Sequence, residues 1–191
     1  FQTQSVAGTP DADPVYGAPT RARPDPHRRG VNLISAASDM VSTPLGELRL
    51  DASEVGLTTI HFPSERAQAA TRHHSNPILD HAKRELAAYF QQGLTRFTVP
   101  LDWQGTPFQQ AVWQALKLIR YGETVSYRDI ALTIGRPRSA RPVGGAIGRN
   151  PLPIIVPCHR VIGSDRSLTG FSGGLWIKER LLNLEGGLPL A

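Results

Sequence analysis

The only cysteine of this 191-residue chain lies in the motif Pro157-Cys158-His159-Arg160, directly after the apolar run 152–156. Branched residues between prolines favour an extended backbone, and the run does not alternate with polar residues, so we expect burial on both faces. A thiol at the end of such a segment would be shielded and next to an imidazole, and a nearby base or cation eases formation of the reactive thiolate. A lone cysteine is more often an inert core residue, so the surrounding sequence must decide.

Composition sets broad limits on the class of protein. The length suits one good core or two small domains. No stretch approaches eighteen consecutive apolar residues and no signal-peptide pattern opens the chain, so no membrane segment is expected. A single cysteine excludes an internal disulfide and predicts a reducing, cytoplasmic location. The formal charge of +5 is compatible with a polyanionic partner without requiring one.

Residues 1–38 differ in composition from the rest of the chain. They contain few large apolar side chains, several prolines and a cluster of arginines near their end. Such a segment buries too little surface to offset its ordering entropy, so it is predicted to be a disordered or loosely attached arm.

Residues 39–103 predict a small α+β domain. Strand patterns on both sides of a turn at 43–46 indicate a hairpin, and a third strand is expected at 57–62. A helix is predicted at 77–92, with Ser75 or Asn76 as its cap. The histidines of this half lack carboxylate or cysteine neighbours at metal-ligand spacing, and a surface position is predicted for them: His61, His73, His74 and His81.

Residues 104–191 predict a mainly helical domain. Thr106 and Pro107 begin a helix with apolar residues to Ile119. Ser126 caps a second helix, followed after a glycine turn by a third at 139–147, in which Pro142 is tolerable only in the first turn. Two short helices around such a turn, with several arginines nearby, indicate a helix-turn-helix. A last helix is expected at 175–184.

Gly144 and Gly145 lie within the predicted third helix. Glycine there costs about 1 kcal/mol relative to alanine. Close approach of a nucleic-acid backbone would explain the pair, and so would close packing against the neighbouring helix.

Taken together, these motifs resemble the O6-alkylguanine-DNA alkyltransferases, which repair alkylated guanine. The likeness covers about 80 residues with order and spacing kept. It rests on Thr106-Pro107-Phe108-Gln109, Tyr121-Gly122-Glu123-Thr124-Val125-Ser126-Tyr127, Ala140-Arg141-Pro142-Val143-Gly144-Gly145-Ala146, Asn150-Pro151, Pro157-Cys158-His159-Arg160-Val161, Ser172-Gly173-Gly174 and Glu185-Gly186. Residues 39–103 resemble the family's ribonuclease-H-like half only loosely.

The resemblance implies irreversible, stoichiometric transfer of an alkyl group from O6-alkylguanine, and from O4-alkylthymine, to Cys158. The partner implied is duplex DNA contacted from the minor groove with the damaged base flipped out, by a monomer that binds singly or cooperatively. No cofactor and no metal are implied. This chemistry needs a soft anionic nucleophile and an acid that protonates the departing guanine, and flipping costs a few kcal/mol.

The resemblance also implies a role for each matched residue. His159 would act on Cys158 through a water, with Glu185 orienting the imidazole and Asn150 as the hinge residue. Tyr127 would protonate guanine N3. Substrate contacts would come from Ser172, Val161, Phe171 and Gly173, and DNA contacts from Tyr127, Ala140, Gly144, Gly145 and the intercalating Arg141.

Three departures from the family pattern and two rival functions complete the prediction. Without a second cysteine, the zinc site of some members is absent; Phe171 replaces a common tyrosine; Pro142 follows the intercalating arginine. A damage sensor on the same fold would bind without transfer, and such members lack the acceptor cysteine. A cysteine hydrolase would also use Cys, His and Glu, but it would turn over repeatedly.

Overall fold

The computed structural model describes residues 37–63 and 76–187. Residues Leu33–Ala191 form one compact unit, and everything described below lies within it. The predicted arm at 1–38 falls almost entirely outside the described residues, as do His73 and His74.

A three-stranded antiparallel sheet forms the first half, in the order β1 (Ala37–Thr43), β2 (Gly46–Ala52), β3 (Leu57–His61). The predicted hairpin is confirmed. Its turn ends at Gly46, whose φ of 101° is a conformation that L side chains rarely adopt. On the central strand Leu48 and Leu50 point into the core, because alternate residues of a strand share a face.

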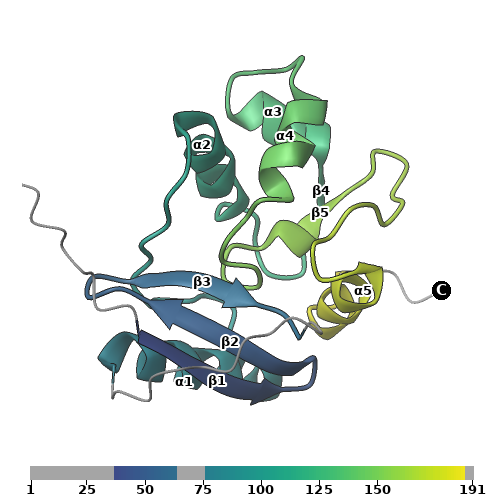
Figure 1. The fold of residues 1–191 in the computed structure, drawn as a ribbon. Coiled ribbons are helices and arrows are strands. Elements are labelled where there is room, and N and C mark those ends of the chain that lie inside the picture. The colour runs from purple at the N-terminus through teal and green to yellow at the C-terminus, as the bar shows by residue number, and fades with distance from the viewer. Residues whose placement is uncertain (1–36, 64–75, 188–191) are drawn as a thin grey trace, which may run out of the picture. The chain divides into compact units, whose positions relative to one another are not determined.

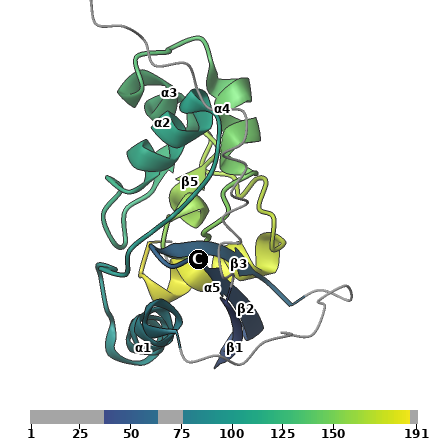
Figure 2. The ribbon, with the colours of Figure 1, turned by 60° about the vertical axis from the view of Figure 1, so that its left-hand side comes forward.

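Helix α1 (Pro77–Gln92) covers one face of this sheet, as Figures 1 and 2 show. Its bounds match the prediction. Asn76 caps it by accepting hydrogen bonds from the backbone N–H groups of Ile78 and Leu79, and Gly93 ends it in the left-handed conformation. The buried side of the helix includes Tyr89, which has no exposed surface.

Three helices of the second half lie close together: α2 (Pro107–Leu116), α3 (Tyr127–Thr133) and α4 (Ala140–Ile147) (Figures 1 and 2). Helix α2 ends three residues before the predicted Ile119. A capping box between Ser126 and Asp129 begins α3 as predicted. Proline at position 142 occupies the first turn of α4, where no helical N–H is lost. The predicted helix pair is therefore present.

The apolar run before Cys158 is buried throughout, but the extended conformation predicted for it is wrong. Residues 152–156 turn instead, with Ile154 at a φ of 74° and the Val156 N–H bonded to the Leu152 carbonyl at 2.8 Å. The Asn150 side chain bonds both Leu152 N and Val156 O, so these backbone groups need no partner strand. The missed strands are β4 (Val125–Ser126) and β5 (Val161–Ile162), which pair in parallel.

The last helix, α5 (Leu175–Leu184), has the predicted bounds. The α+β class is confirmed, with a sheet and helix in the first half and helices in the second. In the ranges 37–63 and 76–187, no helix is long and apolar enough to cross a membrane, and no three His, Cys, Asp or Glu side chains gather as metal ligands would.

Candidate active site

Cys158 begins a single 3₁₀ turn, Cys158–Arg160, that delivers three consecutive side chains into the protein. The cysteine is 3% exposed and its Sγ lies 3.1 Å from Nδ2 of Asn150. The same amide donates to the Val156 carbonyl at 2.8 Å. Asn150, predicted as a hinge residue, therefore holds the loop and contacts the sulfur.

His159 is fully buried and is oriented by one contact. Its Nε2 lies 3.0 Å from Oε1 of Glu185. Burial lowers the pKa of His159 and outweighs the opposing effect of the Glu185 carboxylate, so the ring is neutral at pH 7. A carboxylate only accepts, so Nε2 carries the proton. The other nitrogen, Nδ1, is buried without a partner among the described residues, and its lone pair is free to accept a proton.

Glu185 accepts hydrogen bonds from three segments of the chain. Oε1 accepts from the Tyr89 hydroxyl at 2.6 Å and Arg160 Nη2 at 2.9 Å, besides His159. Oε2 accepts from Arg160 Nε at 2.8 Å, and the Gly122 N–H approaches it at 3.4 Å. Burial alone would raise the pKa of Glu185, but the hydrogen bonds from His159, Arg160 and Tyr89 lower it to about 2. It therefore stays ionised beside the imidazole.

Two of these partners were not predicted. Tyr89 lies within the predicted helix 77–92 but received no role, and Arg160 was part of the cysteine motif and likewise received none. Arg160 also donates from Nη1 to the Ile119 carbonyl at 2.7 Å. The sequence gives only a weak signal for the role of Arg160, namely that an arginine directly follows the Cys-His pair.

Lys178 is the third residue that the sequence reasoning missed. It is 0% exposed, on the inner face of α5, and its Nζ donates to the carbonyls of Val161 at 2.5 Å and Thr169 at 2.7 Å. Burial lowers the pKa of Lys178 to about 8, against the opposing effect of Cys158. The available signal was a lysine next to the apolar residues on the buried side of a predicted helix. Lysine is almost never fully buried without a partner, so a lysine at such a position indicates a polar partner nearby.

The thiol itself is shielded. Burial raises the pKa of Cys158 to about 11, although the Asn150 hydrogen bond and the Lys178 charge act in the opposite direction. At neutral pH the resting sulfur is therefore a thiol, with roughly one molecule in ten thousand ionised. A base that accepts the proton during the reaction is required, and the free Nδ1 of His159 is the group suited to it.

A pocket of about 560 Å³ brings together six of the predicted substrate and DNA residues. The Tyr127 hydroxyl points to its loop wall, donating to the Thr169 carbonyl at 3.1 Å. The volume is within the range of small-ligand sites and suits a purine. The predicted residues that line it are Tyr127, Ala140, Arg141, Gly144, Phe171 and Ser172.

Other predicted residues lie outside this pocket. Val161, expected to contact the substrate, is buried, and its carbonyl accepts a hydrogen bond from Lys178. Gly173 packs against Phe62 rather than lining the pocket. Cys158 is not on its wall; an adjoining pocket of about 400 Å³, which shares Ser172 with the first, is lined by the Asn150 that contacts the sulfur.

Both halves of the chain match descriptions of one protein family. Residues 107–187 match "6-O-methylguanine DNA methyltransferase, DNA binding domain", and residues 39–103 match its "ribonuclease-like domain". The chain belongs to the 6-O-methylguanine DNA methyltransferase family. The resemblance of the sequence motifs to the alkylguanine alkyltransferases is thereby confirmed, together with the ribonuclease-like fold of the first half.

This chain aligns with nearly the whole length of several named relatives. The methylated-DNA–protein-cysteine methyltransferase of Methanosarcina barkeri is 45% identical over 150 residues, 77% of this chain and 95% of that protein. The constitutive enzyme of that name from Bacillus subtilis is 47% identical over 150 residues, 75% of this chain and 91% of its own length. Among solved structures, Mycobacterium tuberculosis OGT in complex with DNA is similar with a TM-score of 0.70 and 45% identity, covering 78% of this chain and 92% of that one.

Proposed function

We propose that this protein is a methylated-DNA–protein-cysteine methyltransferase, which repairs DNA by moving the alkyl group of O6-alkylguanine to its own Cys158. The observation that carries the proposal is the geometry beside the cysteine. His159 is neutral, its Nε2 is held by Glu185, and its Nδ1 is free to accept a proton. Family membership and the names of the relatives supply the substrate class.

The first step activates the sulfur. The Cys158 proton passes, through a water, to Nδ1 of His159, and the ionised Glu185 stabilises the imidazolium that forms. From a thiol pKa of about 11, ionisation at pH 7 costs about 5 kcal/mol without such a base. Lys178 and the Asn150 amide stabilise the thiolate, since both lower the pKa of the thiol.

The second step transfers carbon. The thiolate attacks the alkyl carbon, the new S–C bond forms as the C–O6 bond breaks, and the guanine departs with a proton on N3. Tyr127 supplies that proton by turning its hydroxyl from the Thr169 carbonyl, and the imidazolium proton returns to the phenolate through solvent. The product is a thioether, which has no carbonyl for water to attack. The protein is therefore consumed, one molecule for each lesion.

The damaged nucleotide has to reach this site from outside the duplex. We infer that it is flipped from the minor-groove side into the pocket between α4 and the loop 169–172, with Ser172 and Phe171 against the base. Arg141, exposed at that pocket, would fill the space left in the stack. O4-alkylthymine as a second substrate and a monomeric state, with binding to DNA either singly or cooperatively, belong to the same proposal.

The test is a mass measurement on the cysteine peptide. After incubation with a duplex holding one O6-methylguanine, the Cys158 peptide should gain the mass of one methyl group in place of a hydrogen. Unmodified duplex should add nothing, and Cys158→Ala should gain nothing from either. The number of lesions repaired should equal the number of protein molecules added. A cysteine hydrolase would instead turn over repeatedly, and a damage sensor would transfer no methyl group.

Methyl on another residue, or many lesions repaired by one protein molecule, would contradict the mechanism. Cys158→Ser provides a matched control, because it keeps the size and hydrogen-bonding capacity of the side chain and removes the soft nucleophile.

A further inference from the structure

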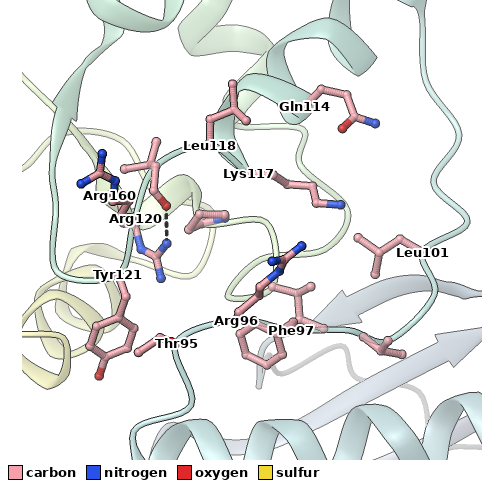
Figure 3. Close-up of a pocket in the computed structure, with 14 residues that line it drawn as sticks. Thr95, Arg96, Phe97, Leu101, Gln114, Lys117, Leu118, Arg120, Tyr121 and Arg160 are labelled. Carbon is pink, nitrogen blue, oxygen red and sulfur yellow. Dashed lines mark hydrogen bonds between the residues drawn. The ribbon is translucent and has the colours of Figure 1, made fainter.

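A second large cavity lies away from the pocket just described. We call it the connector groove, because its walls are residues 95–101, which connect the two halves, and the end of α2 with the loop to Tyr121 (Figure 3). Its volume is about 700 Å³, and it shares no lining residue with the pocket that holds Tyr127. Its floor includes the buried Pro157 and Arg160.

The charge of the groove has one sign. Four cationic side chains line it, and no carboxylate is among its lining residues in the described part of the chain: Arg96, Lys117, Arg120 and Arg160. The chain has 16 acidic residues, so this separation is local rather than a consequence of composition. Cations gathered along a concave surface focus a positive potential there.

Three of these cations are available to a ligand. Arg96 is exposed and has no ion pair within the described residues. The Arg120 side chain is 83% exposed, and its contact with Glu123, at 3.5 Å between exposed groups, contributes little. Lys117 is exposed, and its ammonium lies 5.6 Å from the centroid of the Trp103 ring. Only Arg160 is fully engaged, by Glu185 and the Ile119 carbonyl.

Apolar surface accompanies the charge. Leu118 is 73% exposed at the rim, and the half-buried rings of Phe97 and Tyr121 form part of the wall. Figure 3 shows the cationic groups spread across the groove rather than converging on one point. Such spacing suits several phosphates in a row better than one small anion, and the apolar wall suits the sugars and bases between them.

We propose that the connector groove binds the phosphodiester backbone of a second nucleic-acid strand, apart from the strand that carries the lesion. Arg96, Lys117 and Arg120 contact its phosphates. The groove thus adds affinity for a DNA single strand without reading its sequence, because phosphate contacts carry no base information.

The experiment compares two double variants with the same loss of charge. Arg96→Gln/Arg120→Gln changes the groove, and Arg84→Gln/Arg180→Gln removes two exposed cations that line none of the described pockets. Binding of a fluorescent oligo-dT strand is followed by anisotropy across a KCl series. The groove variant should bind several-fold more weakly, and its slope of log K against log salt should fall by about 1.4, roughly 0.7 for each phosphate contact. The control variant should keep the wild-type slope.

Equal losses in the two variants would overturn the proposal. A second outcome would also overturn it. Inorganic phosphate and chloride are compared as competitors at the same ionic strength, and stronger displacement of the strand by phosphate would show that the groove is a site for free phosphate. Reaction with free O6-benzylguanine is measured alongside and should be the same in both variants and the wild type. It reports on Cys158 alone, so failure of the proposed repair activity and failure of groove binding are distinguishable.

Discussion

The hydroxyl of Tyr89 donates a 2.6 Å hydrogen bond to Oε1 of Glu185, across 96 positions of sequence. It links α1 of the ribonuclease-like half to the carboxylate that orients His159. Burial raises the pKa of Tyr89, and the Glu185 charge raises it further, so the phenol remains a hydrogen-bond donor at neutral pH. The first half of the molecule therefore contributes one hydrogen bond directly to the candidate active site.

Replacing that tyrosine tests the link. Tyr89→Phe should lower the free energy of unfolding by about 1.5–3 kcal/mol, the usual contribution of a hydrogen bond to a charged group, and slow the reaction with O6-benzylguanine. Urea unfolding and single-turnover kinetics measure both. Tyr121→Phe is the matched control, since its hydroxyl bonds only the neutral Leu184 carbonyl at 3.2 Å. Equal effects of the two changes would show that the Glu185 contact is unimportant.

Glu185 predicts a pH dependence of stability. Its pKa falls from an ordinary 4.5 to about 2 on folding, so the unfolded chain binds the proton first as pH drops. The resulting stabilisation, about 3 kcal/mol, is complete above roughly pH 5 and is lost as the pH falls toward 2. Glu185→Gln should remove this part of the acid dependence while lowering stability at pH 7, because Arg160 loses its buried counter-charge. Urea unfolding across this pH range gives both values, and parallel curves for the two proteins would refute the assignment.

Replacing Lys178 should slow the reaction of Cys158 and leave the stability of the protein nearly unchanged. Lys178→Met should raise the pKa of the Cys158 thiol and slow reaction with O6-benzylguanine about tenfold or more at neutral pH, with recovery at higher pH. Stability should change little, because removal of a buried charge offsets the lost hydrogen bonds to Val161 and Thr169. Lys178→Arg should retain part of the rate. A pH–rate profile identical to wild type in Lys178→Met would contradict the electrostatic role.

Replacing a glycine of the Gly144-Gly145 pair in α4 by alanine should stabilise the protein and weaken DNA repair. A Cβ at Gly144 would meet Tyr127 at 3.6 Å, and one at Gly145 would meet the flexible Arg149 side chain at 3.4 Å, so helix packing does not require glycine at either position. Gly145→Ala should therefore raise the unfolding free energy by up to about 1 kcal/mol. Repair of methylated duplex should weaken if a DNA backbone passes here, while reaction with free O6-benzylguanine stays unchanged. Unimpaired duplex repair would remove the DNA-contact role.

Arg141 should matter for duplex substrates alone. Arg141→Ala is expected to slow repair of O6-methylguanine in duplex by at least tenfold and to leave the reaction with free O6-benzylguanine nearly unchanged, since only the duplex needs a flipped base replaced. Arg138→Ala serves as the control, because that arginine is exposed nearby but does not line the pocket. A similar loss on both substrates would show that Arg141 serves the chemistry rather than the flipping.

Local signals in the sequence determined much of the fold. The bounds of α1 followed from Asn76, Pro77 and Gly93, and the start of α3 from Ser126 with Asp129, because capping and turn chemistry act between residues a few positions apart. The family motifs likewise predicted substrate and DNA contacts for Tyr127, Arg141 and Ser172, and these three residues line a single pocket. The conformation of 152–156 was predicted wrongly, since an apolar run records burial but not how its backbone groups are satisfied.

The electrostatics of the candidate site were decided by tertiary structure alone. Tyr89 and Arg160 reach Glu185 from distant segments, and Lys178 lies buried beside the loop it bonds. The pKa of Cys158 depends on desolvation, on the Asn150 hydrogen bond and on the Lys178 charge. No spacing in the sequence encodes such contacts. Desolvation and charge pairing depend on distance in space, and only the folded chain brings these groups within hydrogen-bonding range and removes them from water.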